Sequence, residues 1–273
     1  MFEYSRARTQ RSAAAGMLEL IYHSTVRNVR KGHSNAIIGL IMTMAQSILF
    51  VAAFYFMFSV LGLRGVALRG DFIVFLMSGI FLFLTHTKAI SAVVGSEGPA
   101  NPMMKHAPMN TIVAISGAAL AHLYQQILTA ITILTIYSIV VTPVHIEDPI
   151  GAFGMFPLAW FAGVAVGLVL LAIKPWAPAA VGLLTSLYTR ANMIASGKMF
   201  VANSLPPVML AMFDWNPLFH AIDQARGFAF INYTPRNSSI DYPVYLSLVL
   251  IMVGLMLEFY TRKHASESWG ARA

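Results

Sequence analysis

Three basic side chains interrupt long apolar runs of the sequence, at Lys88, Arg190 and Lys198. A cation at the centre of a lipid bilayer costs about 2.5–3.5 kcal/mol on insertion scales, so it usually faces water or a partner group. We therefore expect Arg190 to line an aqueous path or a dimer contact. Lys88 would lie nearer the cytoplasmic entrance, where snorkelling to the headgroups is the alternative, and Lys198 near the outer surface.

Aromatic rings recur every fourth residue in the first apolar run, at Phe50, Phe54 and Phe58. This spacing places them on one face of a helix. Such stripes usually pack against other helices. Aromatic faces also suit the C–H surfaces of sugars, so these rings are candidates to line a path for glycans.

A cluster of titratable residues, Asp214, His220 and Asp223, is the one candidate for a metal or a catalytic base. Two carboxylates and a single histidine make a weak ligand set, and we expect no metal there. The pattern favours a short outer helix instead, capped by Asp214 or Asn216 and carrying Pro217 in its first turn.

Several kinds of chemistry are excluded or disfavoured by what the sequence lacks. It has no G-x-x-x-x-G-K-[ST] motif, since Gly197-Lys198-Met199 lacks the upstream glycine and the hydroxyl residue. If the protein uses ATP, the ATPase is a separate chain. The absence of cysteine excludes disulfides and thiolate metal sites. None of the 11 acidic residues lies at the centre of an apolar run, which disfavours a carboxylate proton relay.

The elements that must position these residues are membrane helices. Of the 273 residues, 58% are hydrophobic and only 11% charged, which is typical of an all-α integral membrane protein. We expect a six-span domain over residues 35–264, with short re-entrant or outer helices between spans five and six. The expected spans are 36–61, 72–94, 111–141, 153–173, 178–197 and 244–260, joined by a polar segment at 95–108 and an outer segment at 199–242.

The termini are predicted to be cytoplasmic. Residues 1–34 combine a basic tail with an amphipathic pattern over 13–31, which is typical of a helix on an anionic leaflet, although a loose basic tail is the alternative. Basic residues also follow the last span, where 265–273 form a tail. The positive-inside rule then puts both ends inside, and the net charge of +7 is a topology signal rather than a sign of nucleic-acid binding.

The chain resembles the permease subunits of type-2 ABC exporters, in the capsular polysaccharide (KpsM/BexB-like) branch. The resemblance rests on Trp215-Asn216-Pro217-Leu218, followed by His220 and by Ala225-Arg226-Gly227. It is supported by the polar turn from Glu97-Gly98 to Lys105-His106-Ala107-Pro108 and by the ending Tyr260-Thr261-Arg262-Lys263. The helix breakers Gly98, Pro99 and Pro102 depart from what the resemblance leads us to expect of that turn.

The resemblance implies a homodimer in the bacterial inner membrane with two cytoplasmic ATPase subunits, which would hold ATP and magnesium; this chain would need no cofactor. A periplasmic adaptor, an outer-membrane channel and membrane lipids would be further partners, and a glycolipid-linked polysaccharide the substrate. The ATPase would contact the segment that contains Glu97, Gly98, Pro102, Lys105 and His106. The outer gate would contain Trp215, Asn216, Pro217, His220 and Arg226.

Other functions stay open at this point. An O-antigen or teichoic-acid permease of the same type would have the same pattern. A membrane-embedded glycosyltransferase or acyltransferase would need the Asp214, His220 and Asp223 cluster. A purely structural assembly subunit is the third alternative.

Overall fold

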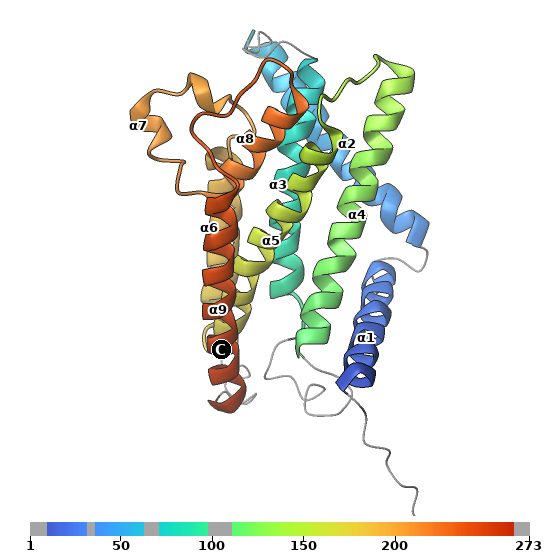
Figure 1. The fold of residues 1–273 in the computed structure, drawn as a ribbon, viewed down its shortest axis with the longest axis vertical. Coiled ribbons are helices and arrows are strands. Elements are labelled where there is room, and N and C mark those ends of the chain that lie inside the picture. The colour runs from blue at the N-terminus through green and yellow to red at the C-terminus, as the bar shows by residue number, and fades with distance from the viewer. Residues whose placement is uncertain (1–9, 32–35, 63–70, 98–110, 265–273) are drawn as a thin grey trace, which may run out of the picture.

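The computed structural model describes residues 10–31, 36–62, 71–97 and 111–264, and every regular element in these ranges is helical. From α2 onward the long helices run alternately up and down, α2 at a strong tilt, and the short helices α7 and α8 lie at the upper end (Figure 1). The elements are α1 (Gln10–Lys31), α2 (Ala36–Val60), α3 (Phe72–Val94), α4 (Thr111–Val140), α5 (Pro149–Ile173), α6 (Pro178–Ala195), η2 (Ala202–Ser204), α7 (Pro207–Leu210), α8 (Pro217–Ala229) and α9 (Asp241–His264).

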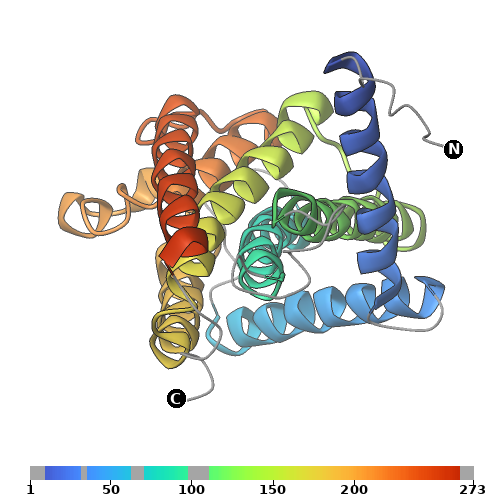
Figure 2. The same ribbon diagram turned by 90° about the horizontal axis from the view of Figure 1, so that it is seen from below.

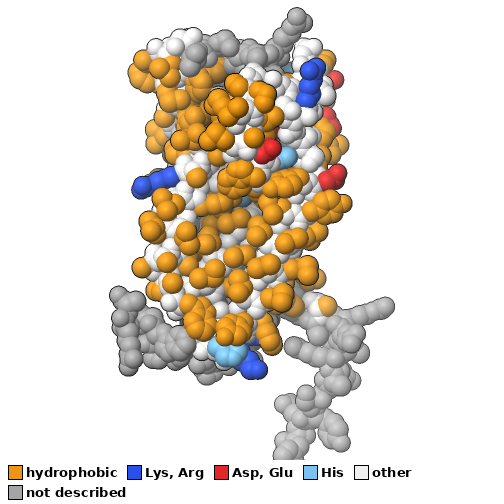
Figure 3. Space-filling view, turned by 90° about the vertical axis from the view of Figure 1, so that its left-hand side faces the viewer, with side chains coloured by type: hydrophobic (Ala, Val, Ile, Leu, Met, Phe, Trp, Pro, Cys, Tyr) orange, Lys and Arg blue, Asp and Glu red, His pale blue; other side chains and the backbone are white. Residues whose placement is uncertain are grey.

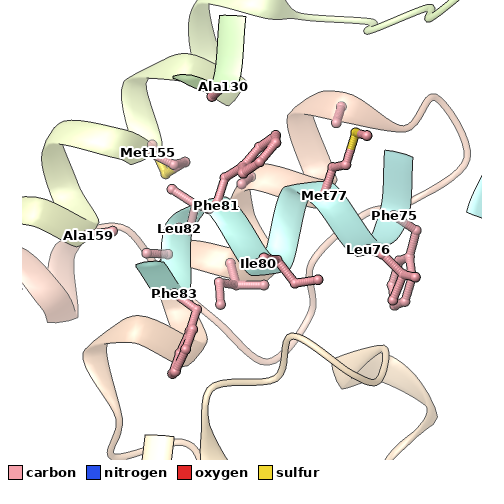
Figure 4. Packing of buried hydrophobic residues seen from close by; sticks show 14 of the residues in the cluster. Phe75, Leu76, Met77, Ile80, Phe81, Leu82, Phe83, Ala130, Met155 and Ala159 are labelled. Carbon is pink, nitrogen blue, oxygen red and sulfur yellow. The ribbon is translucent and has the colours of Figure 1, made fainter. Parts of the chain in front are cut away.

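Helix α3 lies at the centre of the bundle (Figure 2). From Phe72 to Leu84 its sequence is apolar around the circumference except for Ser78, which is typical of a helix that other helices enclose. It contacts α2, α4, α5, α6 and α8. In Figure 4 its side chains point to several sides at once, with Met155 and Ala159 of α5 and Ala130 of α4 packed against it. The core of the protein is therefore built around α3.

Helix α5 approaches α3 closely because two of its residues have no side chain. A Cβ atom at Gly163 would lie 2.5 Å from the carbonyl oxygen of His86, and one at Gly167 would lie 2.9 Å from Cβ of Val93. Small residues four apart allow helix backbones to approach in membranes. His86 uses this approach: its Nδ1 donates to the Ala159 carbonyl at 2.9 Å, so its Nε2 accepts from the Tyr188 hydroxyl at 3.0 Å.

Five helices in the described ranges, α2, α3, α4, α5 and α9, are long and apolar enough to cross a membrane. Helix α6 occupies the fifth expected span, but its 18 residues include Arg190 and it is not among the five. Five of the six expected spans are therefore helices that are long and apolar enough to cross a membrane, and α6 is the exception. The face seen in Figure 3 is covered by hydrophobic side chains, and its acidic side chains lie only in the upper half.

Helix α1 packs along α4 and also touches α2. A Cβ atom at Gly117 of α4 would clash with Ser24 of α1, so the two helices are in close contact. Leu18 and Tyr22 stay 67% and 66% exposed. The apolar residues of α1 are therefore divided between contact with the bundle and an outward face.

Asp71 begins α3 at the upper end of the bundle. Its carboxylate accepts from the Ile73 backbone N–H at 2.8 Å and from the hydroxyls of Tyr137 and Thr142, which lie at the end of α4. Burial raises the pKa of Asp71, but these hydrogen bonds outweigh it and the pKa is lowered from its usual 3.8. Asp71 thereby links the start of α3 to the end of α4.

A pH series should show this link. A carboxylate whose folded pKa lies below its unfolded pKa stabilises the fold fully above the unfolded value, and this contribution is lost as the pH falls through the folded value. The difference in unfolding temperature between the wild type and Asp71→Asn should be constant at neutral pH and shrink below pH 3.8. Thermal unfolding in detergent measures it, with Asp241→Asn as the control. A difference that does not change with pH would contradict the role of the charge.

Candidate functional site

Lys198, which we expected near the outer surface of the membrane, is buried inside the protein and only 1% exposed. Its Nζ donates to the Met193 carbonyl at 2.6 Å and lies 3.9 Å from the ring centroid of Phe83 and 5.2 Å from that of Phe54. Phe50 completes the group at 6.0 Å. An ammonium group over desolvated aromatic faces gains about 2 kcal/mol or more, which helps to offset its burial.

The aromatic stripe of Phe50, Phe54 and Phe58 therefore packs against Lys198 and against rings of α3. Phe50 stacks on Phe83 with centroids 6.0 Å apart, whereas Phe58 packs edge-on against Phe72 at 5.6 Å. The structure brings Phe50, Phe54 and Lys198 together inside the helix packing of a single chain.

Arg226 of α8 holds the segment that contains Lys198. Its guanidinium donates to the carbonyls of Gly197, Lys198 and Phe200 at 2.6–2.8 Å and lies 4.0 Å from the centroid of the Phe75 ring. Burial lowers the pKa of Arg226 to about 10, with Asp223 acting in the opposite direction, so the side chain stays charged at neutral pH. Arg226 therefore fixes α8 to the chain after α6.

The turn after α6 depends on a glycine. Gly197 has a φ of +77°, the left-handed conformation that commonly ends helices. A Cβ atom there would lie 2.9 Å from the Phe219 ring. The turn directs the next residue, Lys198, back toward α3, where Gly79 leaves room for its backbone.

Asn216 caps α8, as the sequence predicts. Its side-chain oxygen accepts from the Leu218 N–H at 3.0 Å, and Pro217 occupies the first turn. Its amide donates to the Asn192 side chain and the Ala195 carbonyl, both at 2.9 Å, and so joins α8 to the end of α6. The neighbouring Trp215 is 57% exposed.

The candidate metal cluster is occupied by structural hydrogen bonds. Asp223 accepts from the hydroxyls of Tyr233 and Ser238. His220 accepts from the Ser239 N–H at Nδ1, so its Nε2 donates to the Asp214 carbonyl at 2.6 Å. No group of three ligating residues occurs among the described residues. These hydrogen bonds connect α8 to the loops before and after it and so shape the outer segment.

A polar cavity of about 580 Å³ opens between α1, α2, α3 and α4, in the half of the bundle where α3 ends. Lys88 and Glu97 of the expected site residues line it. The other polar side chains around it are Arg27, Asn28, Thr43, Gln46, Ser91, Ser96, His122 and Gln125. Its lining can offer both cations and neutral hydrogen-bonding groups to a polar ligand.

The sequence analysis missed most of this lining. A signal was present in the third expected span, where His122, Gln125, Gln126 and Thr129 recur at spacings of three and four residues. Polar residues on one face of a membrane helix usually point to the protein interior or a cavity. The contributions of Arg27 and Gln46 depend on how α1 and α2 pack, which the sequence pattern does not contain.

The remaining expected site residues are dispersed or not described. Arg190 is exposed on α6, and no described carboxylate lies within 4 Å of it. Gly98, Pro102, Lys105 and His106 lie outside the described residues, as do the ends of the chain at 1–9 and 265–273.

Replacing Arg226 tests the anchor of the outer segment. Arg226→Ala leaves three carbonyl groups without their charged donor, so we expect a loss of about 3 kcal/mol in unfolding free energy, seen as a lower unfolding temperature in detergent. The exposed Arg236 provides the matched control, because Arg236→Ala should change little. Equal effects of the two variants would contradict the anchoring role.

Comparison with known proteins gives two relatives. The chain is 26% identical over 199 residues to each of two polysialic acid transport proteins, both named KpsM, from Escherichia coli. The aligned region covers 71% of this chain and 75% of each relative. No family model matches the chain. The similarity confirms the resemblance to KpsM-like polysaccharide transport permeases that the sequence motifs predict.

Proposed function

We propose that the chain is the membrane permease subunit of an ATP-driven exporter that moves a lipid-linked, capsular-type polysaccharide across the bacterial inner membrane. The observation that carries the proposal is the similarity to the two polysialic acid transport proteins over 71% of the chain. The five long apolar helices support it. Because the sequence has no P-loop, ATP and magnesium would be held by a separate ATPase.

In this proposal α6 also crosses the membrane, which brings the number of crossings to six. Its 18 residues extend about 27 Å, close to the thickness of the hydrocarbon core. Six crossings put both ends of the chain on one side. The charges support a cytoplasmic position for the lower end, since Lys174, Arg262 and Lys263 lie there, whereas Asp71, Asp148 and Asp241 begin helices at the upper end.

The ATPase would dock at the lower end, on the segment 95–108. Glu97, at the start of this segment, borders α1 next to Arg27 and Arg30. A movement of the ATPase there would be passed directly to α1 and α3. A periplasmic adaptor and an outer-membrane channel would complete the exporter at the other end.

The path would form where two copies of the chain meet. Helices α2 and α6 expose many apolar residues, among them Ile41, Leu49, Leu183 and Leu187. Arg190 is exposed on the same helix α6. In a dimer joined through these helices, Arg190 would face water and an acidic glycan. Single scattered cations suit a sliding polymer, because attraction must be weak enough to release it.

No observation favours the transferase alternative. The acidic and histidine side chains that it would need are engaged in hydrogen bonds within the outer segment.

Reporter fusions test the topology. Fusions at Gly151 and Asn237 should report the outer side, and a fusion after His264 the cytoplasmic side, because six crossings leave both termini inside. An alkaline phosphatase and fluorescent protein pair measures both sides. A cytoplasmic signal at Asn237 would overturn the six-crossing proposal.

Replacing Arg190 tests the path. Arg190→Ala should reduce export several-fold, and Arg190→Lys should keep part of it, because the charge remains. Export of surface polysaccharide by cells that express the chain with its ATPase is the measurement. Lys263→Ala, which removes an exposed cation at the end of α9, is the control and should export normally.

Labelling of a cysteine at position 190 distinguishes a location in an aqueous path from a location in a packed helix contact. The chain has no other cysteine, so labelling is unambiguous. A water-soluble thiol reagent should react with Arg190→Cys in the assembled complex. Protection in both resting and ATP-cycling complexes would place the residue in a dry helix contact and contradict the path.

A further inference from the structure

The polar cavity between α1 and α4 is separate from the outer segment and from the aromatic site of Lys198. It is bounded by α1, α2, α3 and α4 near the end of α3, whereas the other two sites are built from α8, the turn after α6, Phe50 and Phe54 of α2 and the first half of α3. Polar residues within the membrane are costly unless they have a partner or a function. The cavity therefore calls for an occupant that can use its polar lining.

Positive charge prevails around this cavity. Arg27 and Lys88 line it, with Glu97 as the one carboxylate among its lining residues. Arg30 borders an adjoining hollow together with Arg27 and Glu97. No described carboxylate lies within 4 Å of any of these cations, and Oε2 of Glu97 has no hydrogen-bond partner among the described residues. Lys88 in particular carries a charge that no acid of the described chain neutralises.

The depth of the cavity matches a lipid headgroup. Lys88 lies six residues before the end of α3 at Val94, about 9 Å along the helix. A lysine side chain at this depth can extend its ammonium to the headgroup region. Arg27 reaches the cavity from α1, which packs on the outside of α4.

The surroundings of the cavity are apolar on the outside. Met42 of α2 lines the cavity and is also 57% exposed, and Ile38, one helical turn before it, is 45% exposed. An amphiphile could place its polar group among the cations and its acyl chains along these residues. A soluble anion would use only the first of these features.

We propose that this cavity binds the phosphate group of an anionic lipid headgroup from the leaflet at the basic end of the bundle. Lys88 and Arg27 contact the phosphate oxygens, Gln46 and Gln125 supply neutral donors to the headgroup, and the acyl chains lie along α2. Glu97 limits the net charge, so that one phosphate is held rather than several. The inference goes beyond the proposed function and does not depend on it, because binding requires neither ATP nor transport.

Chemical labelling of lysine tests this site in the full-length protein. The protein is placed in nanodiscs of phosphatidylcholine with or without phosphatidylglycerol and treated with a water-soluble acetylating reagent, and the acetylation of each lysine is measured by mass spectrometry. Phosphatidylglycerol should lower acetylation of Lys88 several-fold relative to Lys263, which is exposed at the end of α9. Arg27→Gln should restore most of the reactivity of Lys88.

Two further measurements decide whether the bound phosphate belongs to a lipid or is free in solution, and whether binding depends on Lys88. Inorganic phosphate is added to phosphatidylcholine nanodiscs: if it protects Lys88 as well as phosphatidylglycerol does, a soluble phosphate is the occupant and the lipid assignment is overturned. Native mass spectrometry then compares the phosphatidylglycerol retained by Lys88→Gln and by Lys263→Gln, and the first should retain several-fold less. Equal acetylation of Lys88 in both lipids, with equal retention by both variants, overturns the site.

Discussion

The close contact between α3 and α5 is the constraint on which the rest of the bundle depends. Gly163 and Gly167 let the two backbones approach to a distance that no other residue would permit. That approach places the Ala159 carbonyl against His86 and so gives a buried imidazole its partner. With α3 held in this way, α2, α4, α6 and α8 can enclose it. A side chain at either glycine would separate the helices and leave buried polar groups without partners.

Polar groups are treated differently at the two ends of the bundle. At the upper end, the two terminal nitrogens of the Arg226 guanidinium donate to carbonyl groups, Asp223 accepts from two hydroxyls, and His220 is bonded to a carbonyl and a backbone N–H. Of these three side chains, only Arg226 keeps a nitrogen, Nε, without a partner among the described residues. In a bilayer, such satisfied groups stabilise one arrangement of the segment between α6 and α9. In the cavity at the lower end, Oε2 of Glu97 and Nδ1 of His122 have no hydrogen-bond partner among the described residues. Most polar side chains named at the upper end are thus bonded within the protein, whereas the cavity at the lower end leaves polar atoms available to a ligand.

The sequence predicted the helices well because apolar length alone determines which segments can cross a bilayer. Five of the six expected spans are helices of suitable length and apolarity, and the Asn216 cap follows from local chemistry at a helix start. The burial of Lys198 was not predicted, because it depends on rings from α2 and α3 that are remote in sequence. The cavity was missed for the same reason: Arg27, Gln46 and Lys88 meet only after the helices have packed.

Lys198 belongs to two parts of the molecule at once. Its carbonyl is bound by Arg226 of α8, while its ammonium lies between the rings of α2 and α3. A rotation of α8 away from the bundle must either break the carbonyl contact or pull the ammonium from its aromatic site. The segment after α6 consequently couples α8 to α2 and to the middle of α3, so we expect a displacement of any one of these helices to be transmitted to the other two.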